Sequence, residues 1–335
     1  MREPSSVVVA RGPKWEEIQL GPARVDLVYG RRLTWRANDE ELADLIAQRV
    51  IARWGSLGIP HAGPDVSATA VVVPKQYFAG VPAVAPLGGP PYMDFVERDI
   101  GYQIVGPLGF GTCAWDRRTA SACLSNAADR SAAVEGMVQH LWGAAVMFHP
   151  PLYALHAAAV VGPDGGATLL LGDSGVGKSS LAAYLALRHG FRYLTDDLTM
   201  VDGRSLTVYG RPWRLEVRPG AMEALWAGAA PDGVAHGDKL VLDARAHVPV
   251  VTSARVTTIV FLRRGAHGLT RVDTSDTLAR LGVPRTMFGA CPGVLAGYGE
   301  AFAGLAAGAR AFSLGVDHSL GIPHASAAVV DAVSA

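Results

Sequence analysis

A glycine-rich segment at 172–179, GDSGVGKS, constrains the fold of this chain more than any other feature of the sequence. It has the spacing GxxxxGK[ST] and lies between an apolar run, ATLLL, and a run with helical spacing, KSSLAAYLALRHG. A loop of this kind turns successive backbone N–H groups inward on an anion, and the start of the following helix adds its dipole. The segment therefore predicts a strand, a phosphate-binding loop (a Walker A motif) and a helix, in that order.

The motif gives each of its residues a candidate role. Lys178 would lie against the β and γ phosphates of ATP, and the hydroxyl of Ser179 would be a ligand of Mg²⁺. The other expected phosphate-binding residues are Gly172, Asp173, Ser174, Gly175, Val176, Gly177 and Ser180. A chance glycine turn is the alternative, and it is disfavoured because eight positions and both flanks agree with the motif. ATP and Mg²⁺ are therefore the expected ligands.

Two adjacent acidic residues, Asp196 and Asp197, end the apolar run FRYLT that follows the helix. A later apolar run, VTTIVFLRR, ends in Arg263 and Arg264 and offers no carboxylate, so the acidic chemistry is assigned to the aspartate pair. Side chains alternate faces along a strand, which suggests two roles for the pair. One carboxylate would hold the metal and the other would accept a proton from an incoming hydroxyl. Capping of the turn before LTMVDG is the alternative.

The composition limits the class of protein. The chain has 335 residues, half of them hydrophobic, which favours about two domains. Thirty basic and thirty acidic residues give a net charge of zero, so neither nucleic acid nor a membrane is an expected partner. Three widely spaced cysteines fit no disulfide framework or metal site and are expected to be reduced thiols. Because no secretory signal and no apolar run of roughly 20 residues is present, a cytoplasmic protein is expected.

The pair Pro150-Pro151 marks the expected domain boundary. Residues 1–148 would form an N-terminal α+β domain and residues 149–335 the ATP-binding catalytic domain. In the second domain, the apolar runs YALHAAAVV and ATLLLG flank GPDGG and predict a hairpin that leads into the phosphate loop. VTTIVFLRR predicts a strand, and the alanine-rich tail is expected to be helical.

The first domain has its own pattern of strands and helices. Residues 24–35 predict a strand pair, and the helix that follows is expected to start in a capping box formed by Asn38 and Glu41. The segment 56–118 is rich in proline and glycine, which predicts short strands with long turns. Apolar spacing predicts a second helix over 131–149.

The second domain also carries a family resemblance. His156 before the hairpin, GDSGVGKSS, a short helix that ends in glycine, and YLTDD together resemble the catalytic core of HPr kinase/phosphorylase, which shares its phosphate loop with phosphoenolpyruvate carboxykinases. The chain is also similar to shorter HPr-kinase-like enzymes of bacterial peptide biosynthesis, including those that phosphorylate the C-terminal serine of lasso peptide precursors. The resemblance covers about 155–265 and implies an α/β fold, with an HPr-kinase-like core of mixed sheet and helices.

The resemblance implies specific roles for the residues that match. Lys178 and Ser179 would bind ATP phosphate and Mg²⁺, Asp196 would be the base that activates an acceptor serine, and Asp197 would lie nearer the metal. His156 matches a family histidine near the phosphates and is the third catalytic candidate beside Lys178 and Asp196; simple packing is the alternative for a single histidine at a strand start.

Downstream of the aspartates the match is partial. Glu216, Val217 and Arg218 resemble an EVRG-like signature, but the chain then continues with Pro219, unlike the bifunctional members of the family. GDKLVL, which contains Lys239, resembles a segment of the kinase-like members. Lys239 is a further phosphate-binding candidate, as is Arg211, with a surface or ion-paired role as the alternative for each.

These patterns favour an ATP-dependent kinase that phosphorylates a serine-type hydroxyl of a peptide or protein. A kinase of a small-molecule hydroxyl is the nearest variant. A nucleotide-dependent switch or assembly ATPase is the alternative from another class, and the aspartate pair distinguishes the two because only a hydroxyl acceptor needs a base. Residues 1–148 would recognise the acceptor or form a homo-oligomer, with Arg31, Arg32 and Lys75 expected at exposed positions.

Overall fold

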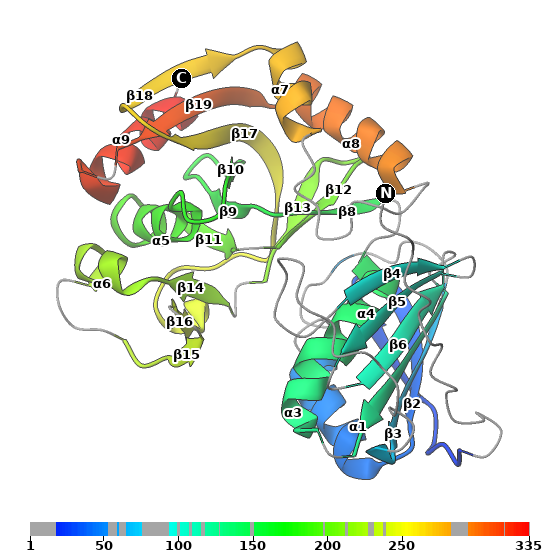
Figure 1. Ribbon diagram of the computed structural model, residues 1–335. Helices are drawn as coiled ribbons and strands as arrows, with labels where there is room; N and C mark the ends of the chain where they lie inside the picture. Colours follow the sequence, from blue (N-terminus) through cyan, green and yellow to red (C-terminus); the bar gives the residue numbers. More distant parts are fainter. Residues whose placement is uncertain are drawn as a thin grey trace, which may run out of the picture. The chain divides into compact units, whose positions relative to one another are not determined.

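A computed structural model divides the chain into two compact units, Met1–His149 and Pro150–Ala335, which are described separately (Figure 1). The sequence placed the boundary one residue earlier. The structure describes residues 18–52, 59, 65–75, 94–98, 101–106, 109–114, 118–126, 128–147, 151–196, 198–211, 214–226, 231–236, 239–282, 294–317 and 319–334. The described part of the chain is a mixed α/β protein with mixed sheets.

The Met1–His149 unit is built on one sheet. Its strands run in the order β1 (Arg24–Val28), β2 (Arg31–Ala37), β3 (Val66–Val73), β7 (Thr119–Ser125), β6 (Gly109–Ala114), β5 (Gly101–Gly106) and β4 (Asp94–Arg98). β3 pairs in parallel with both β2 and β7, whereas the other pairs are antiparallel. The strand pair predicted over 24–35 is therefore confirmed as the hairpin of β1 and β2.

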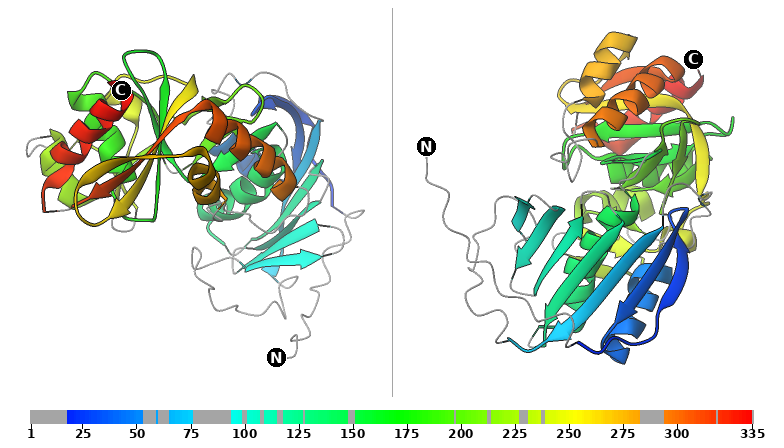
Figure 2. Two further views of the ribbon diagram at one scale, coloured as in Figure 1. Left: turned by 90° about the horizontal axis from the view of Figure 1, so that it is seen from above. Right: turned by 90° about the vertical axis from the view of Figure 1, so that its right-hand side faces the viewer.

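Two helical segments pack on one face of this sheet (Figures 1 and 2). The first is α1 (Glu40–Ile46), which continues as a π-helical turn, η2 (Ala47–Ile51); the second consists of α3 (Arg130–Ala133), a π-helical turn, η4 (Val134–Val138), and α4 (Gln139–Met147). The rings of Trp35 on β2 and Trp142 on α4 lie 5.7 Å apart, and both side chains are buried. The helix predicted over 131–149 is thus present, one residue earlier at its start.

The start of α1 differs from the prediction. Asp39, not Asn38, is the N-cap: its backbone is extended and its carboxylate accepts a hydrogen bond from the backbone N–H of Leu42 at 2.9 Å. The Asn38 amide instead pairs with the backbone N–H and carbonyl of Val72 on β3 at 2.8 and 2.9 Å. Both residue types are good caps, and the sheet contact selects between them.

Arg31 is fully buried, contrary to the expectation that it is exposed. Along β2 the side chains alternate between the helix-covered face and solvent, and Arg31 is in the same phase as the buried Leu33 and Trp35. Its guanidinium donates a hydrogen bond to the carbonyl of Ala145 on α4. Arg32, one residue later, points to solvent as predicted, because successive strand side chains face opposite sides.

The Pro150–Ala335 unit contains a larger mixed sheet. Its strands run in the order β11 (Arg192–Thr195), β9 (Ala158–Val161), β10 (Ala167–Gly172), β17 (Ser253–Arg264), β13 (Thr207–Tyr209), β12 (Thr199–Asp202) and β8 (Leu152–Leu155), and β19 (Arg310–Val316) pairs with both β17 and β18 (Gly268–Val272). β10 and β19 each run parallel to β17. The predicted hairpin is the antiparallel pair β9 and β10.

Helices cover this sheet, and a small second sheet lies beside them. The helices are α5 (Lys178–Arg188), α6 (Pro219–Trp226), α7 (Thr274–Leu281), α8 (Val294–Gly308) and α9 (Gly321–Ser334), with a short 3₁₀ turn, η5 (Ala244–Ala246). The small sheet has the order β14 (Leu215–Val217), β16 (Lys239–Leu242) and β15 (Val234–His236). Side chains of α5, α9, β9 and β10 share one buried core. The alanine-rich tail forms the helices α8 and α9, as predicted, but the strand β19, which was not predicted, lies between them.

One tyrosine satisfies both backbone groups of a residue on an edge strand. The hydroxyl of Tyr298 on α8 accepts a hydrogen bond from the backbone N–H of Ala154 at 3.1 Å and donates one to its carbonyl at 2.9 Å. Ala154 lies on β8, the last strand of the sheet order. The tyrosine therefore pairs this residue as a neighbouring strand would.

Two expectations from composition can be compared with the structure. Cys113 and Cys123 are buried and form no disulfide, and burial raises the pKa of Cys123 to about 12. Cys291 lies outside the described residues. None of the helices in the described ranges combines the length and apolarity needed to cross a membrane.

Candidate functional site

The phosphate loop lies between β10 and α5, as the sequence predicted. β10 ends at Gly172 and α5 begins at Lys178, so the loop spans the residues between them. Gly175 has a φ of 78° and Gly177, the N-cap of α5, a φ of 106°. Residues other than glycine rarely adopt this left-handed backbone conformation. These two glycines therefore let the loop fold back over the start of the helix.

The side chain of Lys178 is held by hydrogen bonds to backbone carbonyls of the phosphate loop. Its side chain is buried, and Nζ donates hydrogen bonds to the carbonyls of Gly172 at 2.9 Å and Asp173 at 3.1 Å. These bonds compensate the burial of a charge, which would otherwise be costly. The ammonium group of Lys178 is thus fixed at the phosphate loop, where the motif predicts contact with phosphate.

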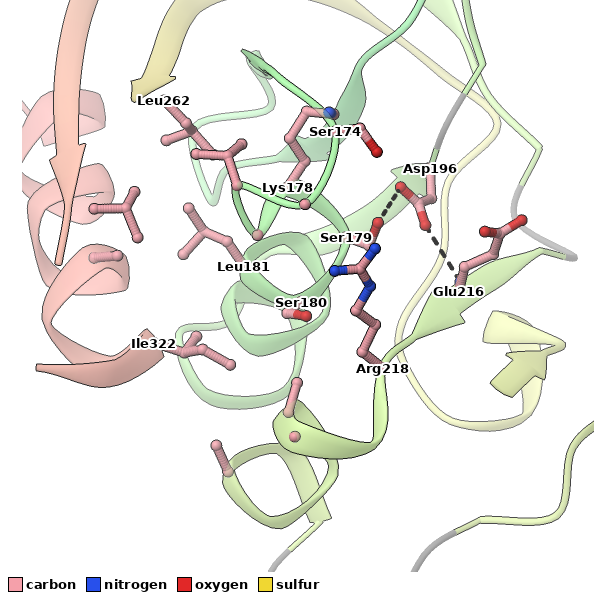
Figure 3. A pocket seen from close by; sticks show the side chains of 18 of the residues that line it. Ser174, Lys178, Ser179, Ser180, Leu181, Asp196, Glu216, Arg218, Leu262 and Ile322 are labelled. Carbon is pink, nitrogen blue, oxygen red and sulfur yellow. Dashed lines mark hydrogen bonds between the residues drawn. The ribbon is translucent and has the colours of Figure 1, made fainter. Parts of the chain in front are cut away.

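Ser179 and Asp196 are in direct contact (Figure 3). The hydroxyl of Ser179 donates a hydrogen bond to Oδ1 of Asp196 at 2.8 Å, and Oδ2 accepts one from the backbone N–H of Glu216 at 3.2 Å. Asp196 follows β11 directly and is only 2 % exposed. The structure therefore brings together the loop serine and the first predicted aspartate. Asp197 lies outside the described residues.

Glu216 is a second buried carboxylate next to this pair. It lies on β14 and forms ion pairs with Arg214 and with Lys239, whose Nζ is 2.5 Å from Oε2 of Glu216. Burial opposes its ionisation, but the hydrogen bond from Lys239 and the charge and hydrogen bond of Arg214 together hold the pKa of Glu216 below its ordinary value. Glu216 is therefore an anion at neutral pH.

A cavity of about 500 Å³ opens over the loop. Its lining includes most of the predicted site residues: His156, Ser174, Gly175, Val176, Gly177, Lys178, Ser179, Ser180 and Asp196. Gly172 and Asp173 contribute the carbonyls that hold Lys178. His156 is half-buried and follows β8 directly. Predicted site residues from three separate segments thus meet at one cavity.

The two other phosphate candidates have different surroundings. Lys239 lines the cavity while paired with Glu216, so it combines the ion-paired role with a position at the site. Arg211 is buried and is not part of the described cavity lining. Its Nε has no hydrogen-bond partner among the described residues. Arg211 therefore does not line the cavity, although the sequence analysis offered it as a phosphate-binding candidate.

One side of the cavity is apolar, and the sequence did not predict it. Its lining comes from α6, β17, β19 and α9: Ala221, Ala224, Leu262, Val316, Ile322, Pro323 and Ala325. In Figure 3, Leu181, Leu262 and Ile322 lie on the opposite side of the phosphate loop from Asp196 and Glu216. The alanine-rich composition of α9 did not predict that this helix lines the cavity, because the same composition fits a helix that only packs on the core.

Candidate metal ligands are few in the described ranges. No group of three His, Cys, Asp or Glu side chains there has the geometry to hold a metal ion. The hydroxyl oxygen of Ser179 and the carboxylate of Asp196, which share a hydrogen bond, are candidate oxygen donors beside the phosphate loop. Mg²⁺ is commonly held by one or two protein oxygens together with substrate phosphates, so this small donor set fits that ion.

Comparisons with known proteins give limited information. No protein-family model matches the chain, and a search of curated proteins finds no match. Among solved structures, the chain is similar to the HPr(Ser) kinase/phosphatase of Coxiella burnetii, with a TM-score of 0.33 and 11% sequence identity, over 53% of this chain and 89% of that one. A likeness of this size does not establish a shared family or a shared activity.

Proposed function

We propose that the Pro150–Ala335 unit is an ATP-dependent kinase that transfers the γ-phosphoryl group to the hydroxyl of a serine side chain in a peptide or protein. The observation that carries this proposal is the contact of Ser179 in the phosphate loop with the buried carboxylate of Asp196, 2.8 Å apart, at a cavity beside Lys178. A phosphate loop alone fits many nucleotide-binding proteins. A carboxylate that reaches its serine at an open cavity adds the group that a hydroxyl acceptor requires.

The loop and Lys178 would bind the phosphates. Backbone N–H groups at the start of α5 and the ammonium of Lys178 offer positive charge in one small region. Phosphoryl transfer depends mainly on positioning and on neutralising charge on the transferred group. The apolar side of the cavity, at Leu262 and Ile322, would receive the nucleoside.

Ser179 would hold Mg²⁺, which would supply charge neutralisation at the phosphates when bound. The resemblance gave the metal to Asp197 and the base to Asp196. The described contact puts Asp196 beside the proposed metal ligand Ser179, so one carboxylate is close enough to serve either role. An experiment on Asp196 has to separate the two.

In the proposed reaction, Asp196 accepts the proton of the acceptor hydroxyl. The hydroxyl oxygen then forms a bond to the γ-phosphorus while the bond from that phosphorus to the bridging oxygen of ADP breaks. The products are the phosphorylated acceptor, ADP and a proton that leaves Asp196 for solvent. His156 lines the same cavity and would contact the phosphates or the acceptor.

The resemblance noted in the sequence supports a peptide acceptor, with a serine at the C-terminus of a lasso-type precursor as the first candidate. Recognition of that peptide is proposed for the Met1–His149 unit. Incubation with γ-labelled ATP, Mg²⁺ and peptides that end in serine tests the function directly. Label on the serine supports it. Label on a small-molecule alcohol alone, or release of phosphate regardless of any acceptor, would replace it with one of the two alternatives.

The variant Asp196→Asn tests the assignment of the base. We expect kcat to fall by about 10²-fold, the scale of general-base loss, while the Mg²⁺ concentration for half-maximal activity stays unchanged. Asp276→Asn is the matched control, because Asp276 is an exposed carboxylate at the start of α7. A large rise in the required Mg²⁺ with little change in the limiting rate would move Asp196 from base to metal ligand.

A further inference from the structure

Arg264 lies at the end of the strand that runs beside the phosphate loop. β17 is parallel to β10, with Leu262 opposite Gly172, so β17 continues for two residues past the point where the loop begins. The side chain of Leu262 lines the cavity. Because residues two apart on a strand share a face, Arg264 points to the same side of the sheet as Leu262, and Arg263 to the other.

The guanidinium of Arg264 reaches the loop itself. A methyl group added at Gly175 would come within 3.2 Å of a terminal nitrogen of Arg264 and 3.3 Å of a terminal nitrogen of Arg218. Arg218 comes from the segment between β14 and α6. Figure 3 shows its guanidinium beside Ser179 and Asp196, at the end of the loop where transfer is proposed. Two arginines from distant segments therefore converge on one loop glycine.

The position of Arg264 suits an anion that the described part of the protein does not supply to this side chain. No carboxylate in the described part of the chain forms an ion pair or hydrogen bond with Arg264, and its side chain is exposed. A negative group that lies near both guanidinium groups would be attracted to each of them. Guanidinium also presents a fork of donors that matches the oxygens of a phosphoryl group.

We propose that Arg264, together with Arg218, binds the terminal phosphoryl group of a nucleoside triphosphate across the loop at Gly175. The role rests on the proposed function, which puts that group at Ser179 and Lys178. This role accounts for the arginine at the end of β17, where the sequence analysis had looked for a metal-binding carboxylate. Since a diphosphate lacks the group that the arginines bind, Arg264 distinguishes triphosphate from diphosphate.

Isothermal titration of the full chain in Mg²⁺ tests this proposal, with a non-hydrolysable ATP analogue and ADP as the two probes. In Arg264→Gln we expect the analogue to bind about tenfold more weakly, the scale of one charge-assisted hydrogen bond, with ADP affinity nearly unchanged. Arg264→Lys should recover part of the loss because it keeps the charge without the fork. Arg263→Gln is the matched control, since its exposed side chain points to the opposite face.

The outcomes separate this proposal from the kinase activity. Equal weakening of the analogue and ADP in Arg264→Gln, or no change in either, overturns the role of Arg264 even if the wild-type protein phosphorylates a peptide. Selective loss of the analogue supports it even if no acceptor is found. Wild-type protein that binds neither nucleotide overturns both. Thermal unfolding of each variant confirms that the comparison is made between folded proteins.

Discussion

The two units build their sheets from similar strands but cover them differently. In the Met1–His149 unit, β2 alternates between buried and outward-facing side chains, because helices cover one face. In the Pro150–Ala335 unit, β9 and β10 are buried along their whole length. A strand buried on both faces leaves little room for functional side chains along its length. The candidate site residues of the second unit accordingly lie just after β11 and near the ends of β10 and β17.

This difference indicates which kind of ligand each unit is suited to bind. The second unit concentrates polar groups at one cavity, whereas the first offers an open sheet face with side chains such as Arg32 and Thr34. A deep site suits a small charged ligand, and an open face or edge suits an extended partner. This contrast motivates the division of labour proposed here, and three experiments test it in order of decreasing effect.

Trp142→Ala should have the largest effect and should act on the first unit alone. Trp142 is fully buried against Trp35, and removing such a side chain costs about 3–5 kcal/mol of unfolding free energy. Calorimetry with and without an ATP analogue should show a lowered transition that the nucleotide does not shift. Trp142→Phe is the control and should cost less, because the indole N–H has no hydrogen-bond partner among the described residues. Loss of nucleotide binding in Trp142→Ala would contradict the independence of the units.

Lys178→Ala should strongly reduce transfer without unfolding the protein. Loss of a preorganised positive group at the transferring phosphoryl is expected to cost roughly 10²–10³-fold in kcat/KM. Lys178→Met preserves most of the buried volume and should show the same loss, which separates charge from packing. Lys75→Ala, in the first unit, is the surface control. Folded Lys178 variants with near wild-type rates would show that the loop does not bind the substrate phosphate.

Charge reversal in the first unit should have the smallest effect. Arg32→Glu and Lys75→Glu change exposed positions, and the ion pair of Arg32 with Asp65 is long, at 3.9 Å, so little stability should be lost. We expect KM for the peptide to rise a few-fold while KM for ATP stays constant, because only acceptor binding is weakened. An equal rise in both would mean that this unit also serves the nucleotide.

The sequence was most informative where local rules act alone. The strand, loop and helix at 167–188 follow from a motif whose glycines need left-handed backbone, and they are found where predicted. The hairpin before the loop and the helices of the tail follow from turn chemistry and apolar spacing. At the start of α1 the sequence analysis named Asn38 as the cap, but Asn38 pairs with β3 and Asp39 is the cap.

The remaining features depend on contacts between distant segments. Glu216 meets Asp196 only because β14 passes the end of β11, and no local pattern encodes that approach. In the sequence, Arg264 only marked a strand end without a carboxylate. Its approach to the phosphate loop follows from the parallel pairing of β17 with β10. Arg31 looked like a surface cation, yet strand alternation turns it inward to a helix carbonyl. Long-range pairing decides such positions, and a single sequence does not contain it.

The bond pair between Tyr298 and Ala154 has a consequence for aggregation. An edge strand exposes unpaired N–H and carbonyl groups that can template pairing with another chain. On β8 a single hydroxyl occupies one donor and one acceptor of the same residue. A foreign strand would have to displace α8 before it could add to the sheet there. The hydroxyl of Tyr298 thus disfavours misassembly at this edge. Phenylalanine has a similar shape but lacks the hydroxyl, so it could not form these two hydrogen bonds.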